Sequence, residues 1–236
     1  MPGEPLTIEY RFRFPEGAEK HFVVRLRPDD LALYPVARAD WPAWTQLGFH
    51  QCENCPLAPA QSPRCPIAAN LVDLIEFFRE VLSYAQAEVT VVTPRRTFRQ
   101  CVPAATGVGS LLGLYMVVSG CPVMDKLRPM AYTHLPFASA EETLYRALSM
   151  YLLGQFFRAR HGATPDWAMR GLVTIYDEIT KVNIGIAARL RSFCERDASL
   201  NALVKLDCFA ATAATSVAEN SLDDLERLFH AYLDSP

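Results

Sequence analysis

Three cysteines lie in one short segment of this 236-residue chain, at Cys52, Cys55 and Cys65. Cys52 and Cys55 are separated by two residues, a spacing at which both thiolates can face one tetrahedral metal ion. Cys65 returns on the same loop. Four prolines keep the segment from forming a helix or a strand: Pro56, Pro59, Pro63 and Pro66. The segment therefore predicts a cysteine knuckle that binds a metal ion.

A closed metal site needs a fourth ligand in addition to these three cysteines. Cys121 is the preferred candidate, because it follows a predicted helix in the glycine–proline turn Ser119-Gly120-Cys121-Pro122. His50 and His134 are the alternatives. The predicted ligand set is therefore Cys52, Cys55, Cys65 and Cys121.

The ligand types favour zinc, which suits a closed site made of thiolates. An iron–sulfur cluster is the alternative, because it also takes four cysteines and because Cys55, Cys65 and Cys121 are each followed by proline, as in ferredoxin-type sequences. Zinc would give the site a structural role, whereas a cluster would make the protein a redox sensor. Two other interpretations stay open: reduced cysteines buried in a stiff loop, and a redox thiol pair at Cys52 and Cys55.

The leading functional hypothesis is a non-enzymatic metal-binding protein with a sensing or adaptor role. A metal-dependent enzyme is the rival, with His50 or His134 completing an open site. A catalytic zinc site usually has fewer thiolates, so three cysteines favour a structural site. The sequence contains no P-loop, nucleophile elbow or dinucleotide-binding glycine motif, and no catalytic residue is predicted.

A second group of chemically capable residues is the arginine cluster Arg95, Arg96, Arg99 and Arg128. Guanidinium groups close together can bind a phosphate or a carboxylate. A solvated basic surface balanced by nearby acids is the favoured interpretation, since such runs of charge are common on protein surfaces.

Composition limits the classes of protein that need to be considered. The hydrophobic fraction of 50%, the charged fraction of 21% and the net charge of −3 are typical of a globular protein and give no general attraction to nucleic acid. Seven cysteines without a secretory signal favour metal or reactive thiols over disulfides and predict a cytoplasmic protein. Residues 102–124 carry no charge, but their glycines and prolines favour a buried helix over a membrane span.

The hydrophobic pattern predicts the elements that must position the cysteines. Alternation predicts a hairpin of strands over 6–14 and 21–26, and a β-branched run predicts a central strand over 88–93. Helical periodicity predicts helices over 67–85, 104–119, 140–160, 165–195, 198–217 and 222–233, with a capping box at Ser139 and Glu142.

The expected fold class is α+β, with a small N-terminal antiparallel sheet and the cysteine knuckle followed by a mainly helical C-terminal half. The expected division is a metal-knuckle region over 1–139 and a helical region over 140–236, packed as one unit. Apolar positions at Leu225, Leu228 and Phe229 could form a homodimer or protein-partner surface on the C-terminal helices.

Three segments resemble an uncharacterised bacterial family known only as a domain of unknown function: Gln51-Cys52-Glu53-Asn54-Cys55-Pro56-Leu57, Ser119-Gly120-Cys121-Pro122 and His134-Leu135-Pro136-Phe137. The resemblance covers most of the chain and implies no particular activity. It groups Cys121 and His134 with the knuckle cysteines, which fits one shared site.

Overall fold

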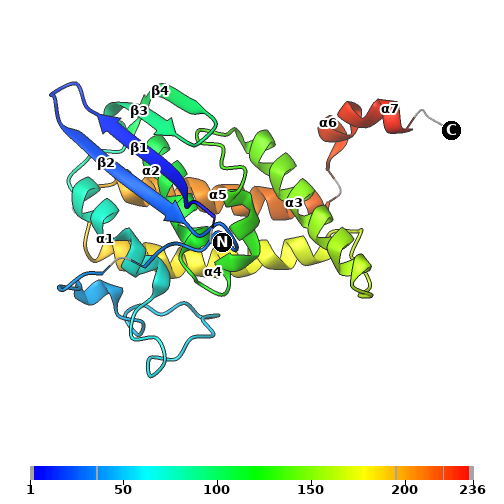
Figure 1. Cartoon of the computed structure of the whole chain (residues 1–236), viewed down its shortest axis with the longest axis horizontal. Coiled ribbons are helices and arrows are strands. Elements are labelled where there is room, and N and C mark those ends of the chain that lie inside the picture. Colours follow the sequence, from blue (N-terminus) through cyan, green and yellow to red (C-terminus); the bar gives the residue numbers. More distant parts are fainter. Residues whose placement is uncertain (1–2, 36, 195, 220, 234–236) are drawn as a thin grey trace.

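A four-stranded antiparallel sheet forms one layer of the molecule, with the strand order β2-β1-β3-β4 (Figure 1). The computed structural model describes residues 3–35, 37–194, 196–219 and 221–233. The strands are β1 (Leu6–Arg13), β2 (Glu19–Leu26), β3 (Gln86–Val92) and β4 (Thr97–Pro103). Along β1 the side chains of Ile8, Tyr10 and Phe12 are buried and alternate with polar residues, so one face of the sheet packs on the core.

The predicted hairpin is confirmed, with β1 and β2 paired from Leu6 opposite Leu26 to Arg13 opposite Glu19. The predicted strand over 88–93 is β3, which is an interior strand as expected. β4 has no counterpart among the predicted strands. It lies at the sheet edge and most of its side chains are exposed, so its sequence lacks the apolar alternation that identifies a half-buried strand.

The second layer is helical, and the long helices α4 and α5 pack along each other beneath the sheet and α2 (Figure 1). α2 contacts α5 closely where Gly109 faces Ala202, since a side chain at Gly109 would lie within 4 Å of that residue. The helices are α1 (Pro66–Phe78), α2 (Ala104–Val118), α3 (Ala140–Arg160), α4 (Arg170–Arg191), α5 (Ala198–Ala218), α6 (Asp223–Glu226) and α7 (His230–Leu233). The described ranges also contain the 3-10 helices η1 (Ala43–Thr45), η2 (Met124–Ala131) and η3 (Arg227–Phe229).

The predicted capping box of α3 is confirmed: the Glu142 amide donates to the Ser139 hydroxyl, and the Ser139 amide donates to the Glu142 carboxylate. Several predicted helix boundaries are wrong: the helix predicted over 222–233 is divided into α6, η3 and α7, and α4 ends at Arg191, before the predicted end at 195, which lies outside the described residues. α1 ends at Phe78 instead of residue 85, because the following chain turns to bond the start of α5, where the Asp197 carboxylate accepts from the Ser83 amide at 2.8 Å.

The start of α4 was expected near Pro165, but the helix begins at Arg170. The Asp166 carboxylate accepts hydrogen bonds from the Gly171 amide at 2.7 Å and the Tyr151 hydroxyl at 2.9 Å. Met169 has a φ of 57°, which is left-handed and therefore not helical. Contacts of the Asp166 side chain thus take the place of the first helical turn that Pro165 predicted.

The sheet followed by a mainly helical half confirms the predicted α+β class. Sheet residues such as Phe12 and helical residues such as Val182 belong to one buried cluster. None of the helices in the described ranges is long and apolar enough to cross a membrane. The uncharged stretch over 102–124 forms α2 and the turn that follows it.

Candidate metal centre

The cysteine-rich loop is fixed at its base by a short ladder of backbone hydrogen bonds. The Cys65 amide donates to the Thr45 carbonyl at 2.8 Å, and the Leu47 amide donates to the Pro63 carbonyl at 3.0 Å. Cys65 is the residue before the first turn of α1, where Pro66 opens the helix because a proline loses no hydrogen bond there. The third cysteine is therefore held rigidly by a strand-like base and by a helix start.

The first two cysteines form the ends of a tight turn. The Cys55 amide donates to the Cys52 carbonyl at 3.1 Å, which closes the turn around Glu53 and Asn54. Asn54 ties the turn to α4, because its side-chain amide donates to both the carbonyl and the carboxylate of Glu178, at 2.9 and 2.7 Å.

Cys52 lies directly against α4. Its sulfur is 3.9 Å from the Val182 carbonyl oxygen, and a Cβ atom built on Gly185 would come within 2.6 Å of that sulfur. Real Cβ atoms do not approach so closely, so a glycine at this position is what allows the loop to reach the helix.

Arg189 anchors the same loop from inside the protein. The side chain is fully buried and donates to the carbonyls of Trp44, Gln46 and Leu47 at 2.7, 2.7 and 2.8 Å. Among the described residues no carboxylate pairs with this guanidinium, and its Nε has no hydrogen-bond partner. A buried cation with only neutral partners is costly, so negative charge close by would stabilise it.

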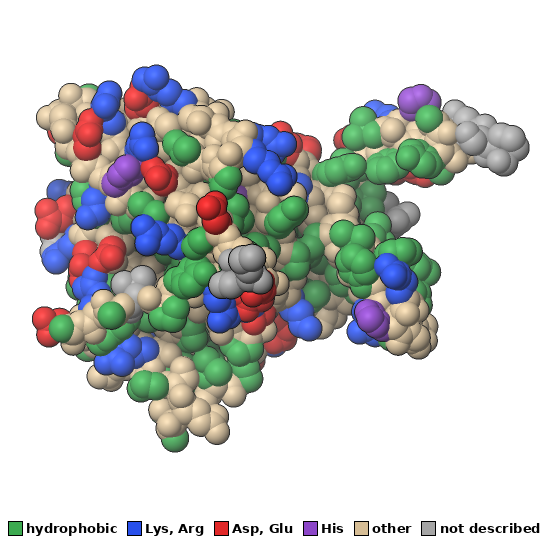
Figure 2. All heavy atoms as spheres, in the orientation of Figure 1, with side chains coloured by type: hydrophobic (Ala, Val, Ile, Leu, Met, Phe, Trp, Pro, Cys, Tyr) green, Lys and Arg blue, Asp and Glu red, His purple; other side chains and the backbone are tan. Residues whose placement is uncertain are grey.

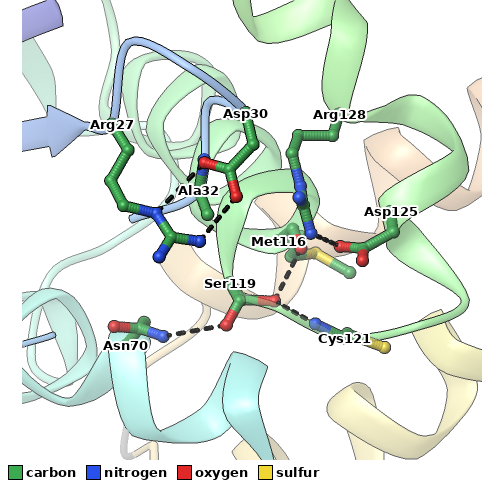
Figure 3. Close-up of polar contacts among 9 residues, drawn as sticks. All are labelled: Arg27, Asp30, Ala32, Asn70, Met116, Ser119, Cys121, Asp125 and Arg128. Carbon is green, nitrogen blue, oxygen red and sulfur yellow. Dashed lines mark hydrogen bonds and ion pairs between the residues drawn. The ribbon is translucent and has the colours of Figure 1, made fainter. Parts of the chain in front are cut away.

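Cys121 enters from a different part of the chain, in the turn after α2 (Figure 3). The Ser119 hydroxyl donates to the Met116 carbonyl at 2.8 Å and accepts from the Cys121 amide at 3.2 Å. Gly120 has a φ of 88°, a left-handed conformation that glycine adopts without strain. Figure 3 shows the Cys121 sulfur pointing away from these bonds.

Burial raises the pKa of the Cys121 thiol. The backbone amides of Met124 and Val123 donate toward the thiol and act to lower this pKa, but their effect is smaller. Amides aimed at a cysteine sulfur are expected in a knuckle that presents a thiolate.

The four predicted ligands lie in or against one hydrophobic core. The pKa of the Cys52 thiol is raised to about 11, chiefly by burial; Cys65, Cys121 and Cys55 contribute to this rise in that order, and the Arg189 cation acts to lower the pKa. The other three cysteines, Cys101, Cys194 and Cys208, have no such part in these interactions.

The side chains as they stand do not form a ready ligand group. Within the described ranges, no cluster of three or more His, Cys, Asp or Glu side chains is close enough to hold a metal ion. Cys52 in particular is turned toward the Val182 carbonyl of α4. Metal binding would require this sulfur to turn away from the helix.

The two histidine candidates lie in different places. His50 is exposed and lines a hollow of about 270 Å³ together with Cys52, Lys181 and Gly185. His134 lies in a larger cavity whose described lining contains none of the four cysteines. Its Nε2 is 2.5 Å from the Tyr10 hydroxyl oxygen, and burial lowers its pKa to about 3.

The arginine cluster is divided between separate ion pairs. Arg99 pairs with Glu88 on the sheet, whereas Arg128 pairs with Asp125 in η2 (Figure 3). Arg95 and Arg96 are exposed between β3 and β4. The favoured interpretation, a solvated basic surface, agrees with the exposure of Arg95, Arg96 and Arg99, whereas the Arg128 side chain is only 19% exposed.

The comparison with protein families gives one result: residues 8–230 match the model of the family described as Domain of unknown function (DUF6901). The chain belongs to this family. The matched range includes all four candidate cysteines as well as His50 and His134. No curated protein and no solved structure matches the chain.

Sequence reasoning missed Arg189, Gly185 and Asn54 as residues that position the site. A signal existed for Arg189, since it lies in the apolar period of α4 marked by Val182 and Ile186. A charged residue in such a row is expected to have a specific partner. Gly185 and Asn54 carry no comparable signal, because their role depends on which loop packs on the helix.

Proposed function

We propose that this chain is a metal-binding protein in which Cys52, Cys55, Cys65 and Cys121 hold a zinc ion with a structural role. The observation that carries the proposal is the placement of these cysteines: a closed turn, the start of α1 and the turn after α2 bring them into or against one hydrophobic core. Four thiolates are the donor set that zinc prefers in a closed site.

The buried Arg189 supports the same assignment. Four thiolates around a zinc ion carry a net negative charge, as do four thiolates around an iron–sulfur cluster. Burial raises the pKa of Cys52, and the guanidinium acts against this rise; it binds no carboxylate among the described residues. An anionic metal–thiolate group would therefore provide the countercharge that the protein side chains around Arg189 do not.

The position of the site suggests a sensing or adaptor role. A metal ion there would join the loop over 48–65 to the turn at Cys121. Without the metal, the proline-rich loop would be held by backbone bonds at its base and its turns and by the contact of Asn54 with Glu178. The loop could then report the metal or redox state of its surroundings to a partner.

A partner surface is proposed on the C-terminal helices. Leu228 is 67% exposed and Phe229 is 41% exposed, whereas Leu225 packs against the core. Figure 2 shows hydrophobic side chains gathered on the segment of α6 and α7, which extends away from the rest of the molecule (Figure 1). We propose a second copy of the chain as the partner.

Elemental analysis of protein purified without oxygen tests the metal site. About one zinc per chain is expected, and Cys55→Ser and Cys121→Ser should each lower the metal content. Cys208→Ser is the matched control, because Cys208 is exposed on α5 and should leave the content unchanged.

Two outcomes would change the conclusion in different ways. Brown protein with visible absorbance and bound iron would replace zinc by a cluster at the same cysteines. Metal-free protein with all seven thiols titratable in the native state would refute the proposed function.

A further inference from the structure

A cavity of about 360 Å³ lies between α2, α4, α5 and the segment that joins η2 to α3. Its volume falls in the range of small-molecule binding sites, which is about 300–1,000 Å³. Most of its wall is apolar, with Leu114, Val117, Leu206 and Phe209 among the lining residues. The four candidate metal ligands take no part in its described lining, so the cavity is independent of the proposed metal site.

One end of this cavity contains hydrogen-bond donors without acceptors. Tyr176 is 2% exposed, lines the cavity, and its hydroxyl has no hydrogen-bond partner among the described residues. Arg146 also lines the cavity and donates through Nη2 to the Met130 carbonyl at 2.9 Å, but its buried Nε is unpartnered. Buried polar groups are usually hydrogen-bonded in proteins, so these two donors can serve an acceptor that enters the cavity.

The remaining polar groups of the cavity already have partners. The Tyr10 hydroxyl contacts His134 Nε2 at 2.5 Å, and it also hydrogen-bonds Ser110. The Lys205 ammonium donates to the Thr106 hydroxyl at 3.1 Å. Among the buried polar atoms of the described lining, the Tyr176 hydroxyl and the Arg146 Nε are therefore the ones that lack a partner.

The charged side chains that line the cavity are positive. It includes the cations Arg146 and Lys205, and no aspartate or glutamate occurs in its described lining. The Arg146 cation also acts to lower the pKa values of His134 and Tyr176, which places its charge near both rings. An acceptor that fits this end of the cavity carries negative charge.

We propose that this cavity binds a small amphipathic carboxylate. The headgroup accepts hydrogen bonds from the Tyr176 hydroxyl and the Arg146 guanidinium, and the apolar body lies along Leu114, Val117, Leu206 and Phe209. A charged acceptor suits these donors because hydrogen bonds to charged groups are about twice as strong as those between neutral groups.

Calorimetric titration of the full chain with straight-chain carboxylates tests the proposal. Affinity should rise about fourfold per methylene from hexanoate through octanoate to decanoate, as the tail leaves water. Decanoate should bind about tenfold more tightly than decanol, which has the same tail without the charge. Equal affinities for decanoate and decanol, or no binding of either, would overturn the proposal.

Variants assign the headgroup contacts. Arg146→Gln should weaken decanoate binding about tenfold and leave decanol binding unchanged, whereas Arg158→Gln, at an exposed position on the same helix, should change neither. The isosteric Tyr176→Phe should weaken decanoate binding several-fold and gives a second test if Arg146→Gln does not fold. Decanoate binding that neither folded variant weakens would contradict the assignment. Because no cysteine is involved, loss of this binding leaves the metal content unaffected.

Discussion

The buried hydroxyl of Tyr176 is expected to lower the stability of the folded protein. It is buried without a hydrogen-bond partner among the described residues, and burial raises its pKa. Because an unsatisfied buried polar group costs about 1–3 kcal/mol, Tyr176→Phe should increase the free energy of unfolding by about 1 kcal/mol. Urea denaturation of the ligand-free protein measures this change.

The matched control for that substitution is Tyr151→Phe. The Tyr151 hydroxyl donates to the Asp166 carboxylate at 2.9 Å, so its removal should lower the free energy of unfolding by about 1 kcal/mol. A lower stability for both variants would show that the Tyr176 hydroxyl is satisfied in solution.

His134 predicts a pH dependence of folding. Burial, followed by the charge of Arg146, lowers its pKa from 6.5 to about 3 in the folded protein. Its folded-state pKa thus lies below the unfolded one, so its contribution to stability is complete above about pH 6.5 and is lost as the pH falls toward 3. The loss is about 1.4 kcal/mol per pH unit in this window, or about 2 kcal/mol between pH 7 and 5.

Urea denaturation at pH 7 and pH 5 measures this loss. His134→Gln should remove about 2 kcal/mol of the difference between the two pH values, since glutamine does not titrate. His161→Gln, at an exposed position, should leave the difference unchanged. An unaltered pH dependence in His134→Gln would show that another group is responsible.

At the residue scale, the sequence predicts a set of cysteine ligands but not the residues that surround them. Type and spacing limit the chemistry of Cys52, Cys55, Cys65 and Cys121, and their grouping in one metal site stays a prediction. Tyr176 and Arg146 are 30 residues apart and share no motif. Their meeting in one cavity depends on how α3 and α4 pack, which local sequence does not determine.

At the scale of the elements, two helical glycines should respond to alanine in opposite ways. A Cβ at Gly185 of α4 would approach the Cys52 sulfur to 2.6 Å, so Gly185→Ala should displace the cysteine loop and lower both the metal content and the stability. At Gly154 of α3 a Cβ meets nothing within 4 Å. Gly154→Ala should therefore raise the free energy of unfolding by about 0.5–1 kcal/mol through helix propensity alone.

Thermal denaturation and zinc analysis of the two variants provide the measurements. If Gly185→Ala retains full metal content and stability, the loop does not depend on close contact with α4. A stability loss in Gly154→Ala would show that α3 makes contacts absent from the described structure.

Element boundaries show where local patterns fail. The hairpin β1–β2 follows from alternation, and the capping box of α3 follows from the types of Ser139 and Glu142. The start of α4 could not be predicted, because the Asp166 carboxylate holds the preceding turn through contacts with Tyr151 and Gly171. The edge strand β4 could not be predicted, because its own sequence lacks apolar alternation. It forms a strand through its pairing with β3.

At the scale of the whole molecule, the α+β class follows from the order of strand and helix patterns along the chain. The packing between distant parts does not. Arg189 joins α4 to backbone carbonyls more than 140 residues earlier, at the base of the cysteine loop. The apolar period of α4 indicates that Arg189 needs a buried partner, but only the structure shows that these carbonyls are the partners.

The exposed apolar surface of the C-terminal helices leads to a prediction about assembly. Leu228, Tyr232 and Leu233 are 67%, 81% and 62% exposed, and Phe229 stacks on Tyr145 of α3 with ring centroids 6.4 Å apart. Association of two copies about a two-fold axis would bury this surface on both copies.

Sedimentation velocity should find a dimer, and Leu228→Glu should shift the dimer to monomer, because it places a charge in the interface. Tyr84→Glu is the matched control, since Tyr84 is 69% exposed on a different part of the molecule. A monomeric wild-type chain at micromolar concentration, or equal dimerisation of both variants, would exclude this surface as the contact between two copies.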